Sequence, residues 1–311
     1  MQRIILNKST KNNLSTVVTI GNFDGIHLGH QELFKTLSDV AHKNNCRTIV
    51  ITFEPLPLEY FCDQLQKLRQ PRLSLLRDKI NILQHLGYID EVIVLHFNSF
   101  VANLTPQEFI VNVLKNKLNV RHAVIGYDFK FGKNGTGNAD DLKEHGITVH
   151  EINPYLKNKQ LISSSIIRDL AAHNQLDKIK SYLGRNLQYT SRVVYGKQLG
   201  RKYNVPTINL SLGRNRPALH GIYVAQVYID GTSYNAVASI GKNPTTSKLE
   251  RYNLEAHLLG VNLDLYGKIA TVEILEFMRD EAEFIDLDTL FKQIHIDIAN
   301  AKEYFEIMNR K

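Results

Sequence analysis

Two histidines three residues apart are the first side chains in this sequence that could act on a ligand. His27 and His30 end the segment 21–30 (GNFDGIHLGH), which directly follows the apolar run 17–20. A turn that begins at Gly21 exposes backbone N–H groups, and the positive end of the following helix attracts an anion. The small Gly29 lets a phosphate chain approach the backbone, and the imidazoles share a helical face. We expect a polyphosphate site; the alternative is two surface histidines on an ordinary turn.

A serine cluster followed by an arginine is the second candidate. Ser163, Ser164 and Ser165 precede an apolar-periodic run, so they can cap a helix and leave hydroxyl and N–H groups for a phosphate. Arg168 comes four residues after Ser164 on the same helical face, where its guanidinium can bind a phosphate through two nitrogens. The alternative is a capped helix with a solvated arginine.

A threonine and an asparagine two residues apart form the third candidate. Thr207 and Asn209 point to the same side of the extended run 205–210 (VPTINL). A hydroxyl and an amide oxygen are hard ligands, suited to a Mg²⁺ that also holds phosphates. The preceding loop, GKQLGR, could cover those phosphates through Gly196, Lys197, Gly200 and Arg201. The alternative is an ordinary turn that enters a strand, because this loop lacks the P-loop spacing.

A glutamate on an alternating segment is the fourth candidate. In the run LEAHL at 254–258, Leu254, Ala256 and Leu258 can face a core, which leaves Glu255 and His257 on the other face. Near a metal–phosphate site, a carboxylate could accept the proton of an attacking hydroxyl. The alternative is a solvated strand carboxylate.

The elements that must position these groups differ between the two halves of the chain. In the first half, short β-rich runs at 17–20, 47–53, 91–97 and 122–126 alternate with helical patterns such as 31–44. This alternation predicts βαβ units and a parallel sheet, whose ligands bind at the carboxyl ends of the strands. We therefore expect a Rossmann-like α/β domain over residues 1–185, closed by a helix that ends at Gly184.

From about residue 188 onward, short alternating segments dominate. The runs 221–228, 234–240, 254–259 and 269–277 are separated by turn signals such as Asp230-Gly231. Strands at these intervals predict an antiparallel sheet or a small barrel. The pattern at 287–308 is that of a helix with one apolar face. We expect a mainly antiparallel β-barrel domain with a C-terminal helix over residues 186–311.

Composition limits the class of protein. A chain of 311 residues with 43% apolar and 22% charged residues is expected to fold into about two globular domains. The excess of 38 basic over 31 acidic residues, +7, suits anionic ligands but is too mild and too dispersed to indicate nucleic-acid binding. Two cysteines make neither a disulfide framework nor a zinc site. With no secretory or membrane-spanning run, we expect a cytoplasmic protein that is a monomer or weak oligomer.

The first two motifs resemble the two signatures of the nucleotidylyltransferase superfamily. The strings FDG at 23–25, FEP at 53–55, RL…K at 72–79 and GYDFKFG at 126–132 are similar to the FMN adenylyltransferase module of bacterial FAD synthetases. This resemblance implies that His27 and His30 contact ATP phosphates and that Ser164 and Arg168 close on them. It also implies a flavin site, for which Phe23 and Asp128 are the candidates, and Asp24 is expected to be a further ligand-binding residue. Catalysis there requires positioning and charge stabilisation by His, Arg and Mg²⁺, without a protein nucleophile.

The later motifs resemble a riboflavin kinase module. These are the segments 196–209, GIY at 221–223, IGKNPT at 240–245, LEAH at 254–257, DLYG at 264–267 and FMRDE at 277–281. The resemblance implies that Thr207 and Asn209 bind Mg-ATP, that Glu255 is the catalytic base and that Arg279 lies beside the flavin. Ser239 departs from the asparagine that the family often has before Ile-Gly.

Together the two resemblances imply a bifunctional riboflavin kinase and FMN adenylyltransferase. Riboflavin and ATP would give FMN and ADP, and FMN with a second ATP would give FAD and pyrophosphate. One rival interpretation keeps a single activity and makes the other domain a regulatory flavin-binding module. A second is a flavin-sensing or RNA-binding protein without enzymatic activity, which the dispersed basic residues do not favour.

Overall fold

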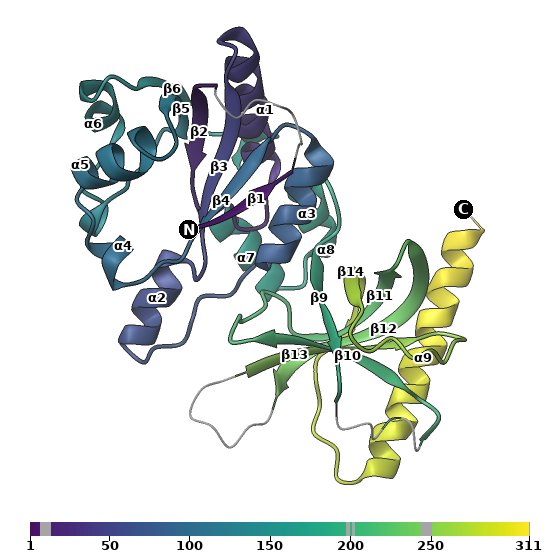
Figure 1. The fold of residues 1–311 in the computed structure, drawn as a ribbon. Coiled ribbons are helices and arrows are strands. Elements are labelled where there is room, and N and C mark those ends of the chain that lie inside the picture. Colours follow the sequence, from purple (N-terminus) through teal and green to yellow (C-terminus); the bar gives the residue numbers. More distant parts are fainter. Residues whose placement is uncertain (7–13, 197–199, 201–202, 244–250, 311) are drawn as a thin grey trace. The chain divides into compact units, whose positions relative to one another are not determined.

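The computed structural model describes residues 1–6, 14–196, 200, 203–243 and 251–310, which belong to two compact units. The first unit contains Met1–Gln70 and Lys79–Ser163, and the second contains Pro71–Asp78 and Ser164–Lys311. Figure 1 labels the elements of both units. The predicted division of the two activities at 185/186 remains a prediction, because compactness does not assign an activity to either side.

The first unit is built on a six-stranded sheet of order β1-β4-β3-β2-β5-β6. The strands are β1 (Gln2–Ile5), β2 (Thr16–Ile20), β3 (Arg47–Phe53), β4 (Glu91–Leu95), β5 (Val120–Gly126) and β6 (Thr148–Ile152). All pairs are parallel except β1 with β4. Strands β2 and β4 are buried along their whole length, as expected for continuous apolar runs covered on both faces. The predicted α/β sheet is confirmed.

Two edge strands were not among the sequence predictions. β1 is short and largely exposed, and β6 (TVHEI) is half-exposed. An edge strand needs few apolar residues, because only one of its sides pairs and its faces are partly solvated. Their period-2 signal is therefore weak.

Helices flank this sheet. α1 (Leu28–Lys43) packs on β2, β3 and β5, and buries Leu33, Phe34, Leu37 and Ala41. The others are α2 (Pro57–Gln64), α3 (Leu76–Leu86), α4 (Ser99–Asn103), α5 (Pro106–Phe109) with the π-helical segment Ile110–Lys115, and α6 (Ala139–Glu144). α4, α5 and α6 gather on the β5–β6 side of the unit (Figure 1). Short strands β7 (Leu156–Lys157) and β8 (Gln160–Leu161) form a separate ribbon.

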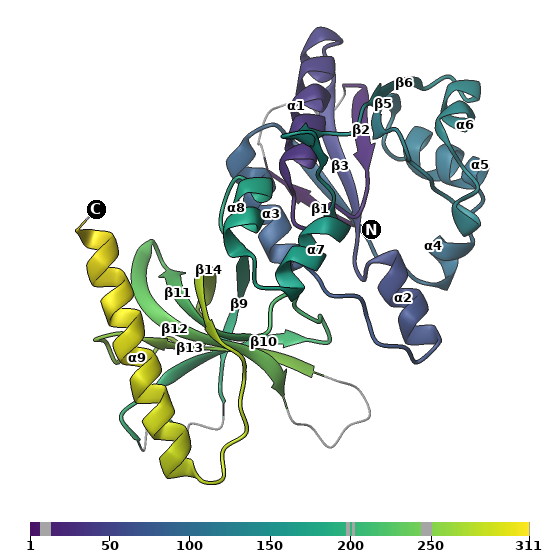
Figure 2. The ribbon, with the colours of Figure 1, turned by 180° about the vertical axis from the view of Figure 1, so that it is seen from behind.

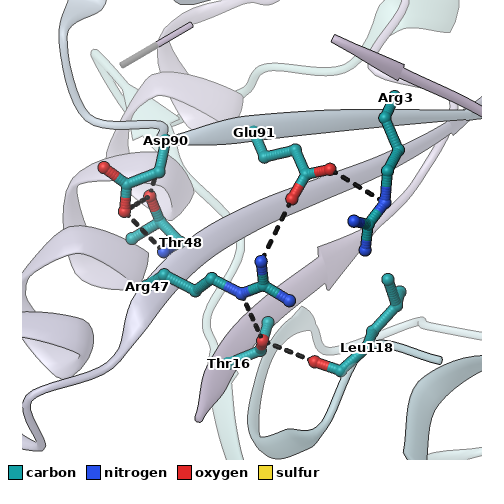
Figure 3. Close-up of polar contacts among 7 residues, drawn as sticks. All are labelled: Arg3, Thr16, Arg47, Thr48, Asp90, Glu91 and Leu118. Atoms are coloured by element: carbon teal, nitrogen blue, oxygen red, sulfur yellow. Dashed lines mark hydrogen bonds and ion pairs between the residues drawn. The ribbon is translucent and has the colours of Figure 1, made fainter. Parts of the chain in front are cut away.

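Polar side chains lock the amino ends of the central strands (Figure 3). Glu91 is buried and accepts hydrogen bonds from Arg47 Nη1 at 3.4 Å and Arg3 Nε at 3.1 Å. Thr16 Oγ1 accepts from Arg47 Nε at 3.1 Å and donates to a backbone carbonyl at 2.6 Å. Asp90 Oδ2 accepts from Thr48 N at 2.9 Å. These polar groups form hydrogen bonds with one another at the amino ends of the strands. Ligand-binding side chains are expected at the opposite, carboxyl ends.

The second unit contains two helices, a closed barrel and a long C-terminal helix. α7 (Ser164–Ala172) is followed by α8 (Leu176–Leu183), which ends at Gly184 in the left-handed conformation, φ 73°, as predicted. The barrel order is β10-β13-β12-β11-β14-β9, all antiparallel. Its strands are β9 (Gln188–Val194), β10 (Thr207–Gly213), β11 (Gly221–Ile229), β12 (Thr232–Asn243), β13 (Arg251–Leu258) and β14 (Ile269–Arg279).

Local sequence signals explain this barrel. Asp230 and Gly231 take φ values of 49° and 82° and connect β11 to β12 in the tight turn that an Asp-Gly pair favours. Buried and less buried residues alternate along β13, with Leu254, Ala256 and Leu258 inward. α9 (Leu287–Asn309) lies along the outside of the barrel next to β12 (Figure 2). The predicted barrel with its C-terminal helix is confirmed. Within the described ranges, no helix is both long and apolar enough to span a membrane.

Candidate active sites in the two units

His27 and His30 lie together at the beginning of α1, as predicted. His27 is the N-cap residue, with extended backbone, and its Nδ1 accepts a hydrogen bond from His30 N at 3.3 Å. The two rings stack, with centroids 3.6 Å apart and planes at 19°. An imidazole therefore replaces the usual hydroxyl or carboxylate cap, and both rings stand where the helix N–H groups attract an anion.

The turn before these histidines packs against the His30 ring. Phe23 is only 4% exposed and packs edge-on against the His30 ring, centroids 5.3 Å apart, and against Phe34 at 5.0 Å. A Cβ on Gly21 would come within 2.9 Å of the Phe23 ring, and one on Gly29 within 3.1 Å of Tyr155 Cβ. Both glycines thus allow close packing around the histidines.

The residues predicted to bind the flavin differ in burial. Phe23 supports His30, and Asp24 is buried in the same turn. Asp128 is exposed just after the carboxyl end of β5, and a Cβ on Gly126 would lie 3.3 Å from its Oδ1. The roles of Phe23 and Asp128 in flavin binding and of Asp24 in ligand binding remain predictions.

Lys79 is a residue whose contact to the same turn was not predicted. Its side chain is 1% exposed, and its Nζ donates a hydrogen bond to Asn22 O at 2.7 Å. Thr52 Oγ1, at the carboxyl end of β3, donates to the same carbonyl at 3.4 Å. The ammonium group fixes the turn and adds positive charge behind an anion site. The string at 72–79 included this lysine but did not show what it contacts.

An aromatic cluster at the carboxyl ends of β3 and β4 was also missed. The rings of Phe53, Tyr60 and Phe61 each contact Phe97 edge-on, with centroids 5.6 to 5.9 Å apart. Phe61 remains 46% exposed on α2. A partly exposed aromatic cluster at the carboxyl edge of a parallel sheet suits a flat aromatic ligand. The available signal was that Phe53 and Phe97 are the last residues of two predicted strands, 47–53 and 91–97.

The serine–arginine motif forms the helix that its sequence predicts. α7 begins at Ser164 and continues through Arg168, with Ser163 immediately before it and Ser165 in its first turn. Arg168 is half-buried and Ser165 is exposed. Ser163 is the last residue of the first compact unit, whereas Ser164, Ser165 and Arg168 belong to the second, so the joint action of this motif with His27 and His30 remains a prediction.

In the second unit, Thr207, Asn209 and Glu255 come together on the paired strands β10 and β13. Asn209 is directly opposite Glu255 in the strand register. Thr207 Oγ1 donates to Glu255 Oε2 at 3.5 Å, and Asn253 Nδ2 donates both to Asn209 Oδ1 at 2.9 Å and to Glu255 Oε1 at 3.2 Å. The Glu255 carboxylate is therefore bonded to the Thr207 hydroxyl and to the Asn253 amide, and the same Asn253 amide holds the side-chain oxygen of Asn209.

Gly196 and Gly200 each make a close contact that a side chain would prevent. A Cβ on Gly196 would lie within 2.5 Å of the Asn209 side-chain amide, and one on Gly200 would overlap the carbonyl of Val205. Lys197 and Arg201, predicted to contact phosphates, lie outside the described residues.

Glu255 stands between two cavities of the second unit. A mainly polar cavity of about 380 Å³ includes Gly196, Asn209 and Glu255 in its lining. A larger cavity of about 660 Å³ lies between the barrel and α9. Its apolar lining comes from Ile222, Val237, Phe284, Leu290, Phe291, Ile294 and Ile298. Ser239, Glu255 and Glu281 line both cavities. An apolar pocket that ends at a carboxylate suits a flat ring with a polar tail.

Arg279 lies in the larger cavity, held by a buried carboxylate. Its Nε and Nη2 donate to Asp297 Oδ1 at 3.0 Å and Oδ2 at 2.7 Å, and Gln293 Nε2 also donates to Oδ1 at 3.0 Å. The guanidinium carbon lies 5.9 Å from the Phe284 ring centroid. This two-point ion pair fixes the arginine to α9 and leaves its plane beside the apolar lining.

The His257 ring has a lowered pKa and a defined hydrogen-bond partner. Burial lowers the pKa of His257, and the positive charges of Lys302 and His295 lower it further, against a raising effect of the Pro206 carbonyl. Nδ1 lies 2.8 Å from Pro206 O. A carbonyl can only accept, so Nδ1 carries the proton in the neutral ring. His257 thus ties β13 to the segment before β10.

Over the parts of the chain that the structure describes, no group of three or more His, Cys, Asp or Glu side chains could hold a metal ion.

Comparisons with known proteins identify the family to which the chain belongs. The sequence profile of FAD synthetase matches residues 9–166, and that of riboflavin kinase matches residues 183–305. The bifunctional riboflavin kinase/FMN adenylyltransferase of Buchnera aphidicola subsp. Acyrthosiphon pisum is 37% identical over 302 residues, 95% of each chain. The protein of the same name from Escherichia coli K12 is 36% identical over 295 residues, 93% of this chain and 92% of its own.

A solved structure also covers nearly the whole chain. The crystal structure of a protein named macrolide-efflux protein, from Streptococcus pneumoniae, matches with a TM-score of 0.73 and 31% identity over 95% of this chain and 96% of that one. On the two profiles and the near full-length identities, the chain contains a FAD synthetase domain followed by a riboflavin kinase domain and belongs to the family of bifunctional riboflavin kinase/FMN adenylyltransferases.

Proposed function

We propose that this chain phosphorylates riboflavin to FMN in the barrel unit and then adenylylates FMN to FAD at the histidine site, with ATP as the co-substrate of both reactions. The observation that carries the proposal is the position of Glu255, which lies beside Thr207 and Asn209 and at the junction of a polar and an apolar cavity.

In the kinase reaction, the larger cavity receives the tricyclic ring of riboflavin and directs its ribityl tail to Glu255. Glu255 accepts the proton of the terminal hydroxyl as that oxygen attacks the γ-phosphorus of ATP, and ADP leaves. Hydrogen bonds from Thr207 and Asn253 fix the orientation of the carboxylate. A base held within reach of the hydroxyl contributes a rate factor of about 10²–10⁴.

The same strands fit a Mg²⁺ ion that arrives with ATP. Thr207 supplies a hydroxyl oxygen and Asn209 an amide oxygen, which Asn253 holds from the other side. One or two protein oxygens completed by phosphate oxygens and water are the usual surroundings of Mg²⁺. When bound, the ion would neutralise charge on the phosphates.

In the adenylyl transfer, the FMN phosphate attacks the α-phosphorus of ATP and pyrophosphate leaves. His27 and His30 donate hydrogen bonds to the phosphate chain at the beginning of α1, and Lys79 holds the turn beneath it. Ser163, Ser164, Ser165 and Arg168 are proposed to bind the same ATP. The aromatic cluster of Phe53, Tyr60, Phe61 and Phe97 provides a stacking surface for the flavin ring. Rate acceleration comes from alignment and charge stabilisation.

The binding partners follow from these reactions: riboflavin, FMN, FAD, ATP, ADP and pyrophosphate. A cytoplasmic location, a monomeric or weakly oligomeric state and the absence of nucleic-acid and membrane binding are predictions of the sequence that solution experiments must test.

One experiment tests both reactions. The purified chain is incubated with riboflavin, ATP and MgCl₂, and the yellow products are separated by chromatography over time. We expect FMN first and FAD second, with one ADP released for each riboflavin phosphorylated and one pyrophosphate for each FAD formed. If riboflavin gives only FMN, or if only supplied FMN is converted to FAD, the chain has a single activity. Unchanged riboflavin and FMN would refute the proposal.

A further inference from the structure

Two carboxylates line both cavities of the barrel unit, and the proposed kinase reaction uses only one of them. Glu255 and Glu281 both line the polar and the apolar cavity, together with Ser239. Ser239 is directly opposite Glu255 in the register of β12 and β13, and Glu281 follows the end of β14. The shared lining thus contains the proposed base on β13 and a second acidic group that is bonded to Ser239 of the neighbouring strand.

Glu281 is held at both carboxylate oxygens. Ser239 Oγ donates to Oε1 at 3.3 Å, and His220 Nε2 lies 3.0 Å from Oε2. The backbone of His220 is fixed in turn by the buried Tyr223, whose hydroxyl donates to His220 O at 2.9 Å. A Cβ on Gly241 would overlap the Glu281 carboxylate, so the glycine provides the space in which the side chain lies.

The position of Glu281 decides which part of a ligand it meets. The ring of a flavin fits the apolar cavity, and the reacting hydroxyl must reach Glu255. The chain that joins them therefore passes Ser239 and Glu281. In riboflavin this chain carries further hydroxyl groups, and an ionised carboxylate has several acceptor positions for such donors.

We propose that Glu281, positioned by Ser239 and His220, accepts hydrogen bonds from the inner hydroxyls of the ribityl chain and so selects a polyol tail over an alkyl tail. This inference rests on the proposed kinase function. A carboxylate facing an alkyl chain would lose its water without gaining a partner, and a site built for hydroxyls discriminates strongly on that ground. Glu281 is a specificity residue, separate from the base.

The test compares riboflavin with a flavin analogue whose ribityl tail is replaced by a pentyl tail that keeps only the terminal hydroxyl. KM and kcat for phosphorylation of each are measured for the wild type and for Glu281→Gln. We expect the variant to raise the KM for riboflavin at least about tenfold, with a much smaller change in kcat and no change in the KM for the analogue. Ser239→Ala should also raise the KM for riboflavin relative to that for the analogue, by a smaller factor.

Controls separate the possible failures. Glu276→Gln makes the same change at an exposed position of β14 and should leave the selectivity unaltered. Conversion of supplied FMN to FAD and the thermal midpoint show whether Glu281→Gln is folded. If Glu281→Gln raises the KM equally for riboflavin and the analogue, or for neither, the role of Glu281 is wrong. The proposed kinase function is unaffected by that result as long as the wild type forms FMN. Failure of the wild type to phosphorylate riboflavin would overturn the proposed function and this inference with it.

Discussion

At the scale of single residues, the candidate sites depend on side chains that hold one another. Glu255 is within hydrogen-bonding distance of Thr207 and Asn253, so its carboxylate has a defined orientation on an otherwise exposed strand face. In the first unit, each histidine of the pair restrains the other through ring stacking and through the cap hydrogen bond.

Glu255→Gln should abolish FMN formation from riboflavin, lowering its rate by at least about 10²-fold, because an amide cannot accept the hydroxyl proton. The conversion of supplied FMN to FAD should continue at the normal rate. Both rates are measured by chromatography of the products. If both reactions vanish in a folded variant, the assignment of two separate sites is wrong.

His30→Ala should let FMN accumulate, with FAD formation lowered about 10²-fold, because a donor to the phosphates is lost. His42→Ala is the matched control, since His42 lies in the last turn of the same helix. FAD produced by the His30 variant at the rate of the His42 variant would contradict the role assigned to His30.

At the scale of elements, strand pairing and close glycine contacts place the functional groups. The β10–β13 register puts Asn209 opposite Glu255, and Gly196 lies against the Asn209 amide. In the first unit, the amino ends of β2, β3 and β4 are fixed by the polar contacts of Figure 3.

Gly196→Ala should displace the Asn209 side chain, because the added Cβ would lie within 2.5 Å of it. We expect the KM for ATP in riboflavin phosphorylation to rise about tenfold, as one contact to the metal–phosphate group is misplaced. Initial rates at varied ATP check this, with FAD formation from FMN as the unaffected reaction. An unchanged KM would show that Asn209 makes no contact with Mg-ATP.

Glu91→Ala should lower the free energy of unfolding of the first unit by about 3 kcal/mol, because Arg47 loses a buried partner. Glu151→Ala removes an exposed partner of Lys143 and should change it by less than about 0.5 kcal/mol. Urea unfolding followed by circular dichroism compares the two variants. Equal effects would mean that burial of the Glu91 contacts does not stabilise the sheet.

At the scale of the whole molecule, the two compact units do not follow the order of the chain. The segment Pro71–Asp78 belongs to the second unit, where Arg72 exchanges backbone hydrogen bonds with Arg216 O at 2.7 Å and Ala218 N at 2.9 Å. Asp78 ends this segment as a fully buried carboxyl group whose Oδ2 accepts from Leu75 N at 2.8 Å. Burial raises the pKa of Asp78 to about 7, although hydrogen bonds from Thr190 and Leu75 and the charge of Arg185 oppose the shift.

This raised pKa makes stability depend on pH with a defined sign. The folded chain keeps the Asp78 proton up to a pH of about 7, whereas the unfolded chain loses it near the ordinary pKa of 3.8. The contribution of Asp78 to stability is therefore complete below pH 3.8 and is lost as the pH rises to about 7. Asp78→Asn should remove this dependence, so the variant gains stability relative to the wild type between about pH 5 and pH 7, and the difference levels off above that range.

Urea unfolding at several pH values measures this difference, with Asp169→Asn as the same change at an exposed position. Parallel profiles for the wild type and Asp78→Asn would show that the carboxyl group is ionised in the folded chain at all these values.

Local sequence patterns determined a large part of this protein. Continuous apolar runs gave the inner parallel strands, period-2 alternation gave β13, and Gly184 ended α8, because burial and backbone preference act within a few residues. For the same reason, the relation of His27 to His30 and of Thr207 to Asn209 could be predicted from spacing alone.

Only the tertiary structure decided which distant residues meet these local groups. Lys79 contacts Asn22 across 57 positions of sequence, Ser239 contacts Glu281 across 42, and Phe61 and Phe97 gather beside Phe53 at the sheet edge. Such contacts arise from strand order and barrel closure, which no local period encodes. The sequence alone therefore predicted the reactive groups and the elements that carry them, whereas the cavities and the neighbours that orient those groups depend on how the elements pack.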